Sequence, residues 1–287
     1  MADFDVRPDG IGLVVSDVDG TLLTPDKRLT PRTAAAVRRL RGEGVHFALA
    51  STRPPFGLYQ FVTPLGLTTP LLACAGAVAV APDTHRILAS RPLSGALVLE
   101  LLEVVEARGL DVRLFWADRW AVPSLRDRGV GSELRTLGQE PEVCEDPKSV
   151  ADTGIFKLTM VGEPLELKRT REQLRREFRG RVSLAHSEGQ TLDVMHPLID
   201  KGRAVRKLAE HLGLPMERVA VIGDSDGDLS MFRAAGLSIA MANSPVEVRR
   251  AADRTAPSNM ADGVAAALEA WVMPAEPMIG HLPGPGA

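Results

Sequence analysis

A short apolar run near the N-terminus ends in an acidic loop, and this junction constrains the fold more than any other feature. Ile11 to Ser16 is apolar and partly β-branched, which predicts a strand buried on both faces. The run Asp17-Val18-Asp19-Gly20-Thr21 follows directly. Open α/β sheets hold their functional groups at the carboxyl ends of the strands. The sequence therefore predicts a site at this junction.

The next segments alternate between helical and strand patterns. Thr30-Pro31 predicts the N-cap and first turn of a helix, and Val45 to Ala50 predicts a second buried strand. A helix that continues to about Leu65 and a strand from Leu71 to Cys74 are expected after it. This order of elements predicts an α/β fold with a doubly wound, Rossmann-like parallel sheet.

The chain has 287 residues, more than one average domain needs. Beyond residue 82 the pattern changes to that of an α+β domain, and the α/β alternation resumes with a helix from Lys201, N-capped by Asp200. The tail is rich in proline and glycine without periodicity, which predicts disorder. We therefore predict a catalytic core, an inserted α+β cap domain and a disordered tail, at residues 1–82 with 194–273, 83–193 and 274–287, respectively.

Composition excludes several classes of partner. A formal net charge of −3 offers no basic surface for nucleic acid. The two cysteines, Cys74 and Cys144, are far apart, which argues against a disulfide scaffold or a zinc site. The N-terminus is acidic, and no apolar run approaches the ~18 residues of a membrane span. We expect a cytoplasmic protein, a monomer or homodimer, that engages neither nucleic acid nor membrane.

A second acidic loop follows another predicted strand. Gly223-Asp224-Ser225-Asp226-Gly227-Asp228 comes after Val219 to Ile222, as the first loop follows its own strand. Carboxylates at neighbouring strand ends bind hard cations such as Mg²⁺, so Asp17 and Asp224 are the expected ligands. Calcium is disfavoured because the glutamate that ends an EF-hand loop is missing and flanking helices are not indicated.

The first loop has the groups needed to hydrolyse a phosphomonoester. One carboxylate, Asp17, would act as nucleophile, and the other, Asp19, as general acid and then base. Taken alone, the run could equally be a turn that uses Asp and Gly for their backbone preferences. Lys201 and Ser51 would offset the charge of the phosphate. Each also has a plainer interpretation, as a solvated surface lysine and a helix cap.

Four motifs together resemble the haloacid dehalogenase superfamily of phosphatases, in particular the Cof-like subgroup with a large α+β cap inserted after the third core strand. The resemblance covers nearly all of the chain up to about Val272. Its motifs, in chain order, are Asp17-Val18-Asp19-Gly20-Thr21, Ala50-Ser51-Thr52-Arg53, Lys201-Gly202 and Gly223-Asp224 through Asp228.

The resemblance implies roles for individual residues. Asp17 would become the phosphoaspartate, and the backbone carbonyl of Asp19 would also bind Mg²⁺. Ser51 would bind phosphate through its hydroxyl, with Thr52 beside it. Asp224 would bind the metal. The expected site comprises the catalytic residues Asp17, Asp19 and Lys201, the phosphate-binding residues Ser51, Thr52 and Lys201, and the metal ligands Asp17, Asp19, Asp224 and Asp228, the last near the metal or Lys201.

Some positions depart from the family pattern. The usual Asn-Gly-Ala after the third strand reads Ala75-Gly76-Ala77, and Ser225 and Gly227 replace the glycine and asparagine of the fourth motif. Two asparagines that normally lie near the phosphate are therefore absent, which leaves substrate and rate open.

Arg53 is predicted to be an exposed ion-pair partner outside the catalytic set. Three aromatic residues are predicted to belong to the cap core, namely Phe115, Trp116 and Trp120.

We interpret the chain as a Mg²⁺-dependent phosphomonoester hydrolase. By the resemblance, its substrate is a small phosphorylated metabolite of the sugar phosphate or phosphoglycerate type, hydrolysed through an aspartyl phosphate on Asp17. Two alternatives stay open. The same intermediate would support phosphotransfer to another alcohol, and the missing asparagines are compatible with a phosphate-binding protein that has lost catalysis.

Overall fold

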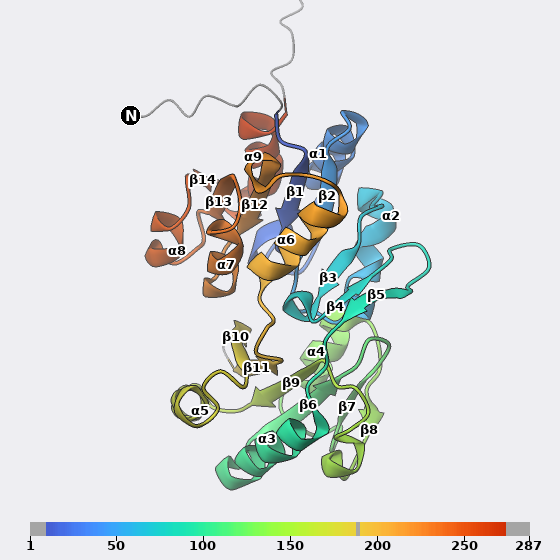
Figure 1. The fold of residues 1–287 in the computed structure, drawn as a ribbon, viewed down its shortest axis with the longest axis vertical. Helices are drawn as coiled ribbons and strands as arrows, with labels where there is room; N and C mark the ends of the chain where they lie inside the picture. Colours follow the sequence, from blue (N-terminus) through green and yellow to red (C-terminus); the bar gives the residue numbers. More distant parts are fainter. Residues whose placement is uncertain (1–9, 188–189, 274–287) are drawn as a thin grey trace, which may run out of the picture.

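A parallel five-stranded sheet, built from strands near both ends of the described chain, forms the centre of the core (Figure 1). The computed structural model describes residues 10–187 and 190–273. In the order β14-β13-β12-β1-β2, every neighbouring pair is parallel. The strands are β1 (Leu13–Ser16), β2 (His46–Leu49), β12 (Val219–Gly223), β13 (Leu237–Met241) and β14 (Arg254–Ala256).

Helices cover both faces of this sheet, because its strands are apolar on both sides. In β1, Val14 packs into the cluster that contains α1 and α9, whereas Leu13 and Val15 pack into the cluster with α6 and α7. This arrangement confirms the predicted doubly wound α/β core. The helices are α1 (Pro31–Gly42), α6 (Lys201–His211), α7 (Leu229–Phe232), α8 (Val246–Arg250) and α9 (Gly263–Trp271).

The third predicted strand joins the core sheet by a single parallel bridge, between Ala50 and Leu72. It belongs to an antiparallel sheet of β3 (Leu71–Ala73), β4 (Val78–Val80) and β5 (Ile87–Ser90). The helix predicted before it is shorter than expected. Two 3₁₀ turns come first and only α2 (Val62–Leu65) is α-helical, because Pro54 and Pro55 donate no hydrogen bond and Gly57 favours helix weakly.

A second, mostly antiparallel sheet lies beside the core, in the order β10-β11-β9-β6-β7-β8. Two long helices, α3 (Gly95–Arg108) and α5 (Pro164–Glu177), pack on one of its faces. The short helix α4 (Val130–Leu137) packs with aromatic residues of the other face. The strands are β6 (Asp111–Phe115), β7 (Trp120–Val122), β8 (Glu142–Val143), β9 (Lys157–Val161), β10 (Ser183–Ser187) and β11 (Thr191–Met195).

Side chains alternate between the two faces of this second sheet. In β6, Val112 and Leu114 join the α3–α5 cluster, while Arg113 and Phe115 project to the opposite face. Phe115 stacks on Trp120 with ring centroids 5.8 Å apart, and both are fully buried. The aromatic residues are therefore core residues, as predicted.

The predicted domain boundaries stay predictions. The boundary after residue 82 falls between β4 and β5, and the one before residue 194 falls within β11. The predicted tail, 274–287, lies outside the described residues. In residues 10–187 and 190–273, no helix combines the length and the apolar character needed to cross a bilayer.

Candidate active site

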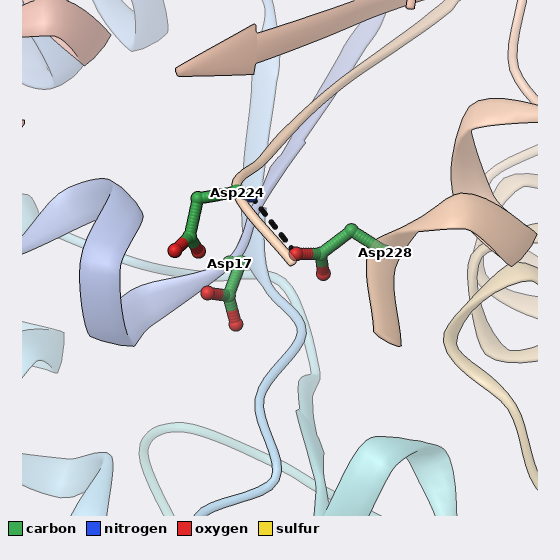
Figure 2. Close-up of side chains that lie close together, drawn as sticks. All are labelled: Asp17, Asp224 and Asp228. Atoms are coloured by element: carbon green, nitrogen blue, oxygen red, sulfur yellow. Dashed lines mark hydrogen bonds between the residues drawn. The ribbon is translucent and has the colours of Figure 1, made fainter. Parts of the chain in front are cut away.

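The two acidic loops meet because their strands are neighbours. β1 and β12 pair in parallel with Ser16 opposite Ile222, so Asp17 and Asp224 leave the same edge of the sheet. Asp228 reaches the same point from the turn before α7. One carboxylate oxygen from each of these three aspartates lies within 4.8 Å of the others. Figure 2 shows the three side chains gathered at the strand ends.

Lys201 ties two of these carboxylates together. Its Nζ donates to Asp17 Oδ1 and to Asp228 Oδ1, both at 2.6 Å, and all three side chains are buried. Burial alone would lower the pKa of Lys201, but the two carboxylates raise it above its usual value. Asp200 caps the helix by accepting from the Arg203 amide, as predicted. Lys201 is therefore a buried cation and not a solvated surface residue.

Asp228 holds the second loop in shape. Its Oδ2 accepts from the amides of Asp224 and Ser225, at 3.0 and 2.9 Å, and from the Ser225 hydroxyl at 3.0 Å. The first of these bonds is the dashed line in Figure 2. Because Oδ1 accepts from Lys201, both oxygens of Asp228 already have partners. The side chain positions the loop and the lysine.

Three carboxylates share one ammonium group, so the cluster has an excess of negative charge. Burial raises the pKa of Asp17 well above its usual value, against the pull of Lys201, and Asp228 and Asp224 raise it further. Burial and the charge of Asp228 raise the pKa of Asp224 to about 6. A hard divalent cation would relieve this repulsion, and carboxylate oxygens are the ligands that it prefers. The donor set therefore fits a divalent metal.

Asp19 points to different partners. Its carboxylate accepts from Arg53 Nε at 2.6 Å and from Arg53 Nη2 at 2.7 Å, and it forms a salt bridge of 3.0 Å with Lys27. Burial alone would raise the pKa of Asp19, but hydrogen bonds and charges from Arg53 and Lys27 lower it. The carboxylate of Asp19 is thus kept ionised beside, but outside, the group of three aspartates.

The prediction that Arg53 is exposed is wrong. Its side chain is only 4% exposed, and its Nη1 also donates to the carbonyl oxygens of Gly57 at 3.3 Å and Thr136 at 3.1 Å. Thr136 lies in α4, so Arg53 links Asp19 to the second sheet's region. A fork of donors opposite a carboxylate is the usual reason to bury arginine. The only sequence signal was its place at the end of the second motif. Lys27, in the loop after β1, had none.

Ser51 and Thr52 lie differently from each other. The buried Ser51 hydroxyl accepts from the Arg53 amide at 3.1 Å. Ser51 is not among the residues that line the cavity above Asp17, whereas Thr52 is. The carbonyl oxygen of Thr52 accepts from Lys157 Nζ at 3.0 Å. The phosphate-binding roles implied for both residues stay predictions.

Two asparagines, Asn243 and Asn259, brace the first loop. Asn243 Nδ2 donates to the Gly20 carbonyl at 2.9 Å, and its Oδ1 accepts from the Asn259 amide at 3.0 Å. Asn259 Nδ2 in turn donates to the Leu23 carbonyl at 2.7 Å. Gly20 has a φ of +83°, and a Cβ there would lie 2.2 Å from Asp224 Oδ2. The loop can therefore approach the second acidic loop only with glycine at this position.

A cavity of about 310 Å³ opens above these residues, between the core and the second sheet. We call the core side of the cavity its floor, formed by Asp17, Asp19, Lys201 and Asp224. We call the other side its roof, with the charged residues Arg113, Glu133 and Lys157.

The roof residues pair among themselves and with their neighbours. Arg113 donates to Glu133 at 2.9 Å and to the Arg128 carbonyl at 2.8 Å. Lys157 lies 3.5 Å from Asp193 and 4.2 Å from the centre of the Phe115 ring. None of the charged roof residues was predicted from the sequence. Strand alternation was the one signal that could have found Arg113 and Lys157.

Comparison with known proteins gives a consistent result. The model of the haloacid dehalogenase-like hydrolase family matches residues 14–268. A putative phosphatase of Haemophilus influenzae is 30% identical over 257 residues, which cover 89% of this chain and 96% of the relative. A pyridoxal phosphate phosphatase of Escherichia coli is 24% identical, over 88% of this chain and 96% of the relative.

Solved structures agree in fold. The crystal structure of a haloacid dehalogenase-like hydrolase from Bacteroides thetaiotaomicron superposes with a TM-score of 0.82 at 26% identity. The match covers 90% of this chain and 98% of that one. The chain therefore belongs to the haloacid dehalogenase-like hydrolases, among the phosphatases of the Cof-like subgroup.

Proposed function

We propose that the protein hydrolyses small phosphorylated metabolites in two steps through an aspartyl phosphate on Asp17. The observation that carries the proposal is the setting of this carboxylate. One of its oxygens, Oδ1, accepts from Lys201 at 2.6 Å, and the side chain lines the cavity that also contains Asp19.

In the first step, an oxygen of Asp17 attacks phosphorus and the bond from phosphorus to the leaving alcohol oxygen breaks. A proton from the Asp19 carboxyl group goes to that alcohol, so this step needs Asp19 in its protonated form, which Arg53 and Lys27 disfavour in the free protein. Lys201 stays charged, because its two carboxylate neighbours raise its pKa, and it offsets the charge of the phosphoryl group.

In the second step, a water oxygen attacks phosphorus and the bond from phosphorus to Asp17 breaks, which releases inorganic phosphate. Asp19 takes the proton of this water and is ready to act as acid again. Arg53 and Lys27 favour the ionised form that the second step needs, since they lower the pKa of Asp19.

Mg²⁺ is the cation that we propose for the acidic cluster. Asp17 and Asp224 would hold it through side-chain oxygens, and the carbonyl of Asp19 is the further ligand that the family resemblance implies. When bound, the cation would withdraw charge from the phosphoryl oxygens. Asp228 would position the loop and Lys201, because its oxygens are already occupied.

The size and polarity of the cavity support a small, charged substrate. A volume of about 310 Å³ is at the lower end of ligand pockets, and five of its lining side chains are cations. These cations are Lys27, Arg53, Arg113, Lys157 and Lys201. A sugar phosphate or a phosphoglycerate derivative fits this description. Of the charged residues, those on the roof would contact the leaving group, because they lie opposite Asp17.

The two-step route can be tested with two isosteric variants. Phosphate release from a panel of phosphorylated metabolites, with Mg²⁺ or with EDTA, should be lost in Asp17→Asn. In Asp19→Asn, p-nitrophenyl phosphate should still phosphorylate the protein because its leaving group needs no acid, and intact mass should show the trapped phosphoryl group.

The matched control is Asp226→Asn, an exposed aspartate of the second loop. Undiminished activity in Asp17→Asn would refute the proposal. The amounts of free phosphate and released alcohol distinguish hydrolysis from phosphotransfer. Hydrolysis releases equal amounts of the two, whereas transfer to another acceptor releases less phosphate than alcohol.

A further inference from the structure

A second cleft, of about 790 Å³, lies between the β4–β5 hairpin and α6. Figure 1 shows the hairpin beside this helix, on the side of the core away from α8. The cleft shares no lining residue with the cavity above Asp17. Its volume lies within the range of small-molecule pockets. Nothing in the proposed hydrolysis uses it.

The walls of this cleft are apolar. Leu72, Ala204 and Leu208 are buried residues that line it from β3 and α6. Ile87 and Leu88 of β5 line it while 46% and 42% exposed. Exposed large apolar side chains that share a concave surface indicate a place where an apolar group is bound.

Basic side chains also line this cleft. The charged residues that line the cleft are Asp200 and five basic residues, namely Arg86, Arg91, Arg203, Lys207 and His211. Asp200 is already engaged, because it caps α6 and forms a salt bridge of 3.2 Å with Arg203. Within the described part of the chain, no salt bridge involves Arg86, Arg91 or Lys207. The cleft therefore has a positive rim without matching carboxylates.

We propose that this cleft binds a free small molecule with an apolar body and an anionic group, a phosphate or a carboxylate. The apolar body would remove Ile87 and Leu88 from water. The anionic group would pair with Arg86, Arg91 or Lys207. This proposal is independent of the hydrolysis at Asp17, since no residue is common to the two sites.

Two other occupants are less compatible with the cleft. In a second copy paired antiparallel along β5 about its midpoint, Arg86 would face Arg91 of the other copy, and like charges directly opposite destabilise a sheet. A membrane surface is flat, whereas these cations surround a hollow. Both occupants are nevertheless outcomes that the experiment distinguishes.

The probe is 8-anilinonaphthalene-1-sulfonate, an aromatic anion whose fluorescence rises in apolar sites. We expect saturable binding to the folded full chain, with displacement by octyl phosphate but not by inorganic phosphate or octanol. Inorganic phosphate also tests for binding at the Asp17 cavity, because it would compete there.

The rim is tested by the triple variant Arg86→Gln, Arg91→Gln and Lys207→Gln. Each lost charged contact should lower the affinity for the probe roughly tenfold. The matched control is Arg206→Gln, which removes an exposed cation of α6 that does not line the cleft, and binding should be unchanged. Thermal melting checks that each variant is folded. If the triple variant does not fold, Lys207→Gln alone should still lower the affinity for the probe.

Three results would overturn the proposal. The first is probe binding that is absent, or unchanged in the rim variants. The second is sedimentation of the protein with phosphatidylglycerol vesicles, lost in the triple variant, which would assign the rim to a membrane surface. The third is a concentration-dependent dimer that the triple variant changes, which would assign it to a second copy.

Discussion

The floor and the roof of the cavity above Asp17 are both charged, but their charges are balanced differently. On the floor, Asp17 and Asp224 share with Asp228 a single ammonium group, that of Lys201. On the roof, each cation has a carboxylate of its own, with Arg113 beside Glu133 and Lys157 beside Asp193. The floor therefore has negative charge that a ligand must neutralise, and the roof does not.

Under the proposed function, this difference would assign the chemical step to the floor and substrate recognition to the roof. The floor is held by short contacts between distant segments of the chain, so its geometry is fixed before substrate arrives. On the roof, an anionic group of a substrate could take the place of Glu133 or Asp193 beside the paired cation. Thr52 and Arg53 connect the two, because the carbonyl of Thr52 accepts from Lys157 and Arg53 donates to both Asp19 and Thr136.

The strongest test of the floor is Asp17→Asn. We expect phosphatase activity to fall by about 10⁴-fold or more, because the proposed nucleophile is lost while the shape is kept. The measurement is the initial rate of phosphate release at saturating Mg²⁺. Thr136→Ser, which changes the roof but keeps the backbone acceptor of Arg53, should stay within a few-fold of wild type. Similar losses in both variants would contradict the division between floor and roof.

Arg53→Lys tests the connection between them. Lysine keeps the charge but cannot fork onto Asp19 and also reach Thr136, so kcat should fall by roughly 10²-fold. Because Arg53 lowers the pKa of Asp19, its loss raises that pKa, and the acid limb of the pH–rate profile should move to higher pH. The control is Arg32→Lys, in an exposed salt bridge with Glu269. An unmoved acid limb would show that Arg53 does not act through Asp19.

The sequence was informative about the floor. Asp17, Asp224 and Lys201 each lie at the end of a strand or the start of a helix, and parallel strand ends meet at one edge. A motif and a strand pattern were therefore sufficient to predict that they gather. The same reasoning predicted the doubly wound core, because its strands are apolar on both faces.

The roof could not be predicted in the same way. Arg113 and Lys157 come from β6 and β9, and their meeting above Asp17 depends on how the second sheet packs against the core. No local pattern encodes that packing. The exposure of Arg53 was predicted wrongly for a related reason. Arginine is usually exposed, and the acceptors that compensate its burial, above all Asp19, come from distant parts of the chain.

Asp224→Asn tests whether the floor has unneutralised charge. The folded pKa of Asp224 is about 6, above the usual 3.8, so folding favours the protonated form. In EDTA, the contribution of Asp224 to the stability of the wild type should therefore be fully present below about pH 3.8 and be lost as pH rises through about 6. The variant should be more stable than wild type at pH 7, by on the order of 1–2 kcal/mol, and should not be stabilised by Mg²⁺.

Thermal and urea unfolding between pH 5 and 8 measure this effect. Asp226→Asn is the matched control, because it removes an exposed charge from the same loop. A variant that loses stability at pH 7 would show that Asp224 is stabilising in the metal-free protein, and the charge excess of the floor would be an incorrect inference.

The smallest effect is expected on the roof, from Glu133→Gln. Glu133 is 22% exposed but its partner Arg113 only 5%, and glutamine keeps an oxygen that can accept from the buried guanidinium while it removes the carboxylate charge. A substrate with a second negative charge, such as a phosphoglycerate, should then bind better, with KM lower by roughly two- to fivefold. A neutral sugar phosphate should change less, and kcat should be unchanged for both. The comparison is steady-state kinetics of the two substrates on both proteins. If Glu133→Gln instead lowers kcat equally for both, the roof takes part in the chemical step and the separation from the floor fails.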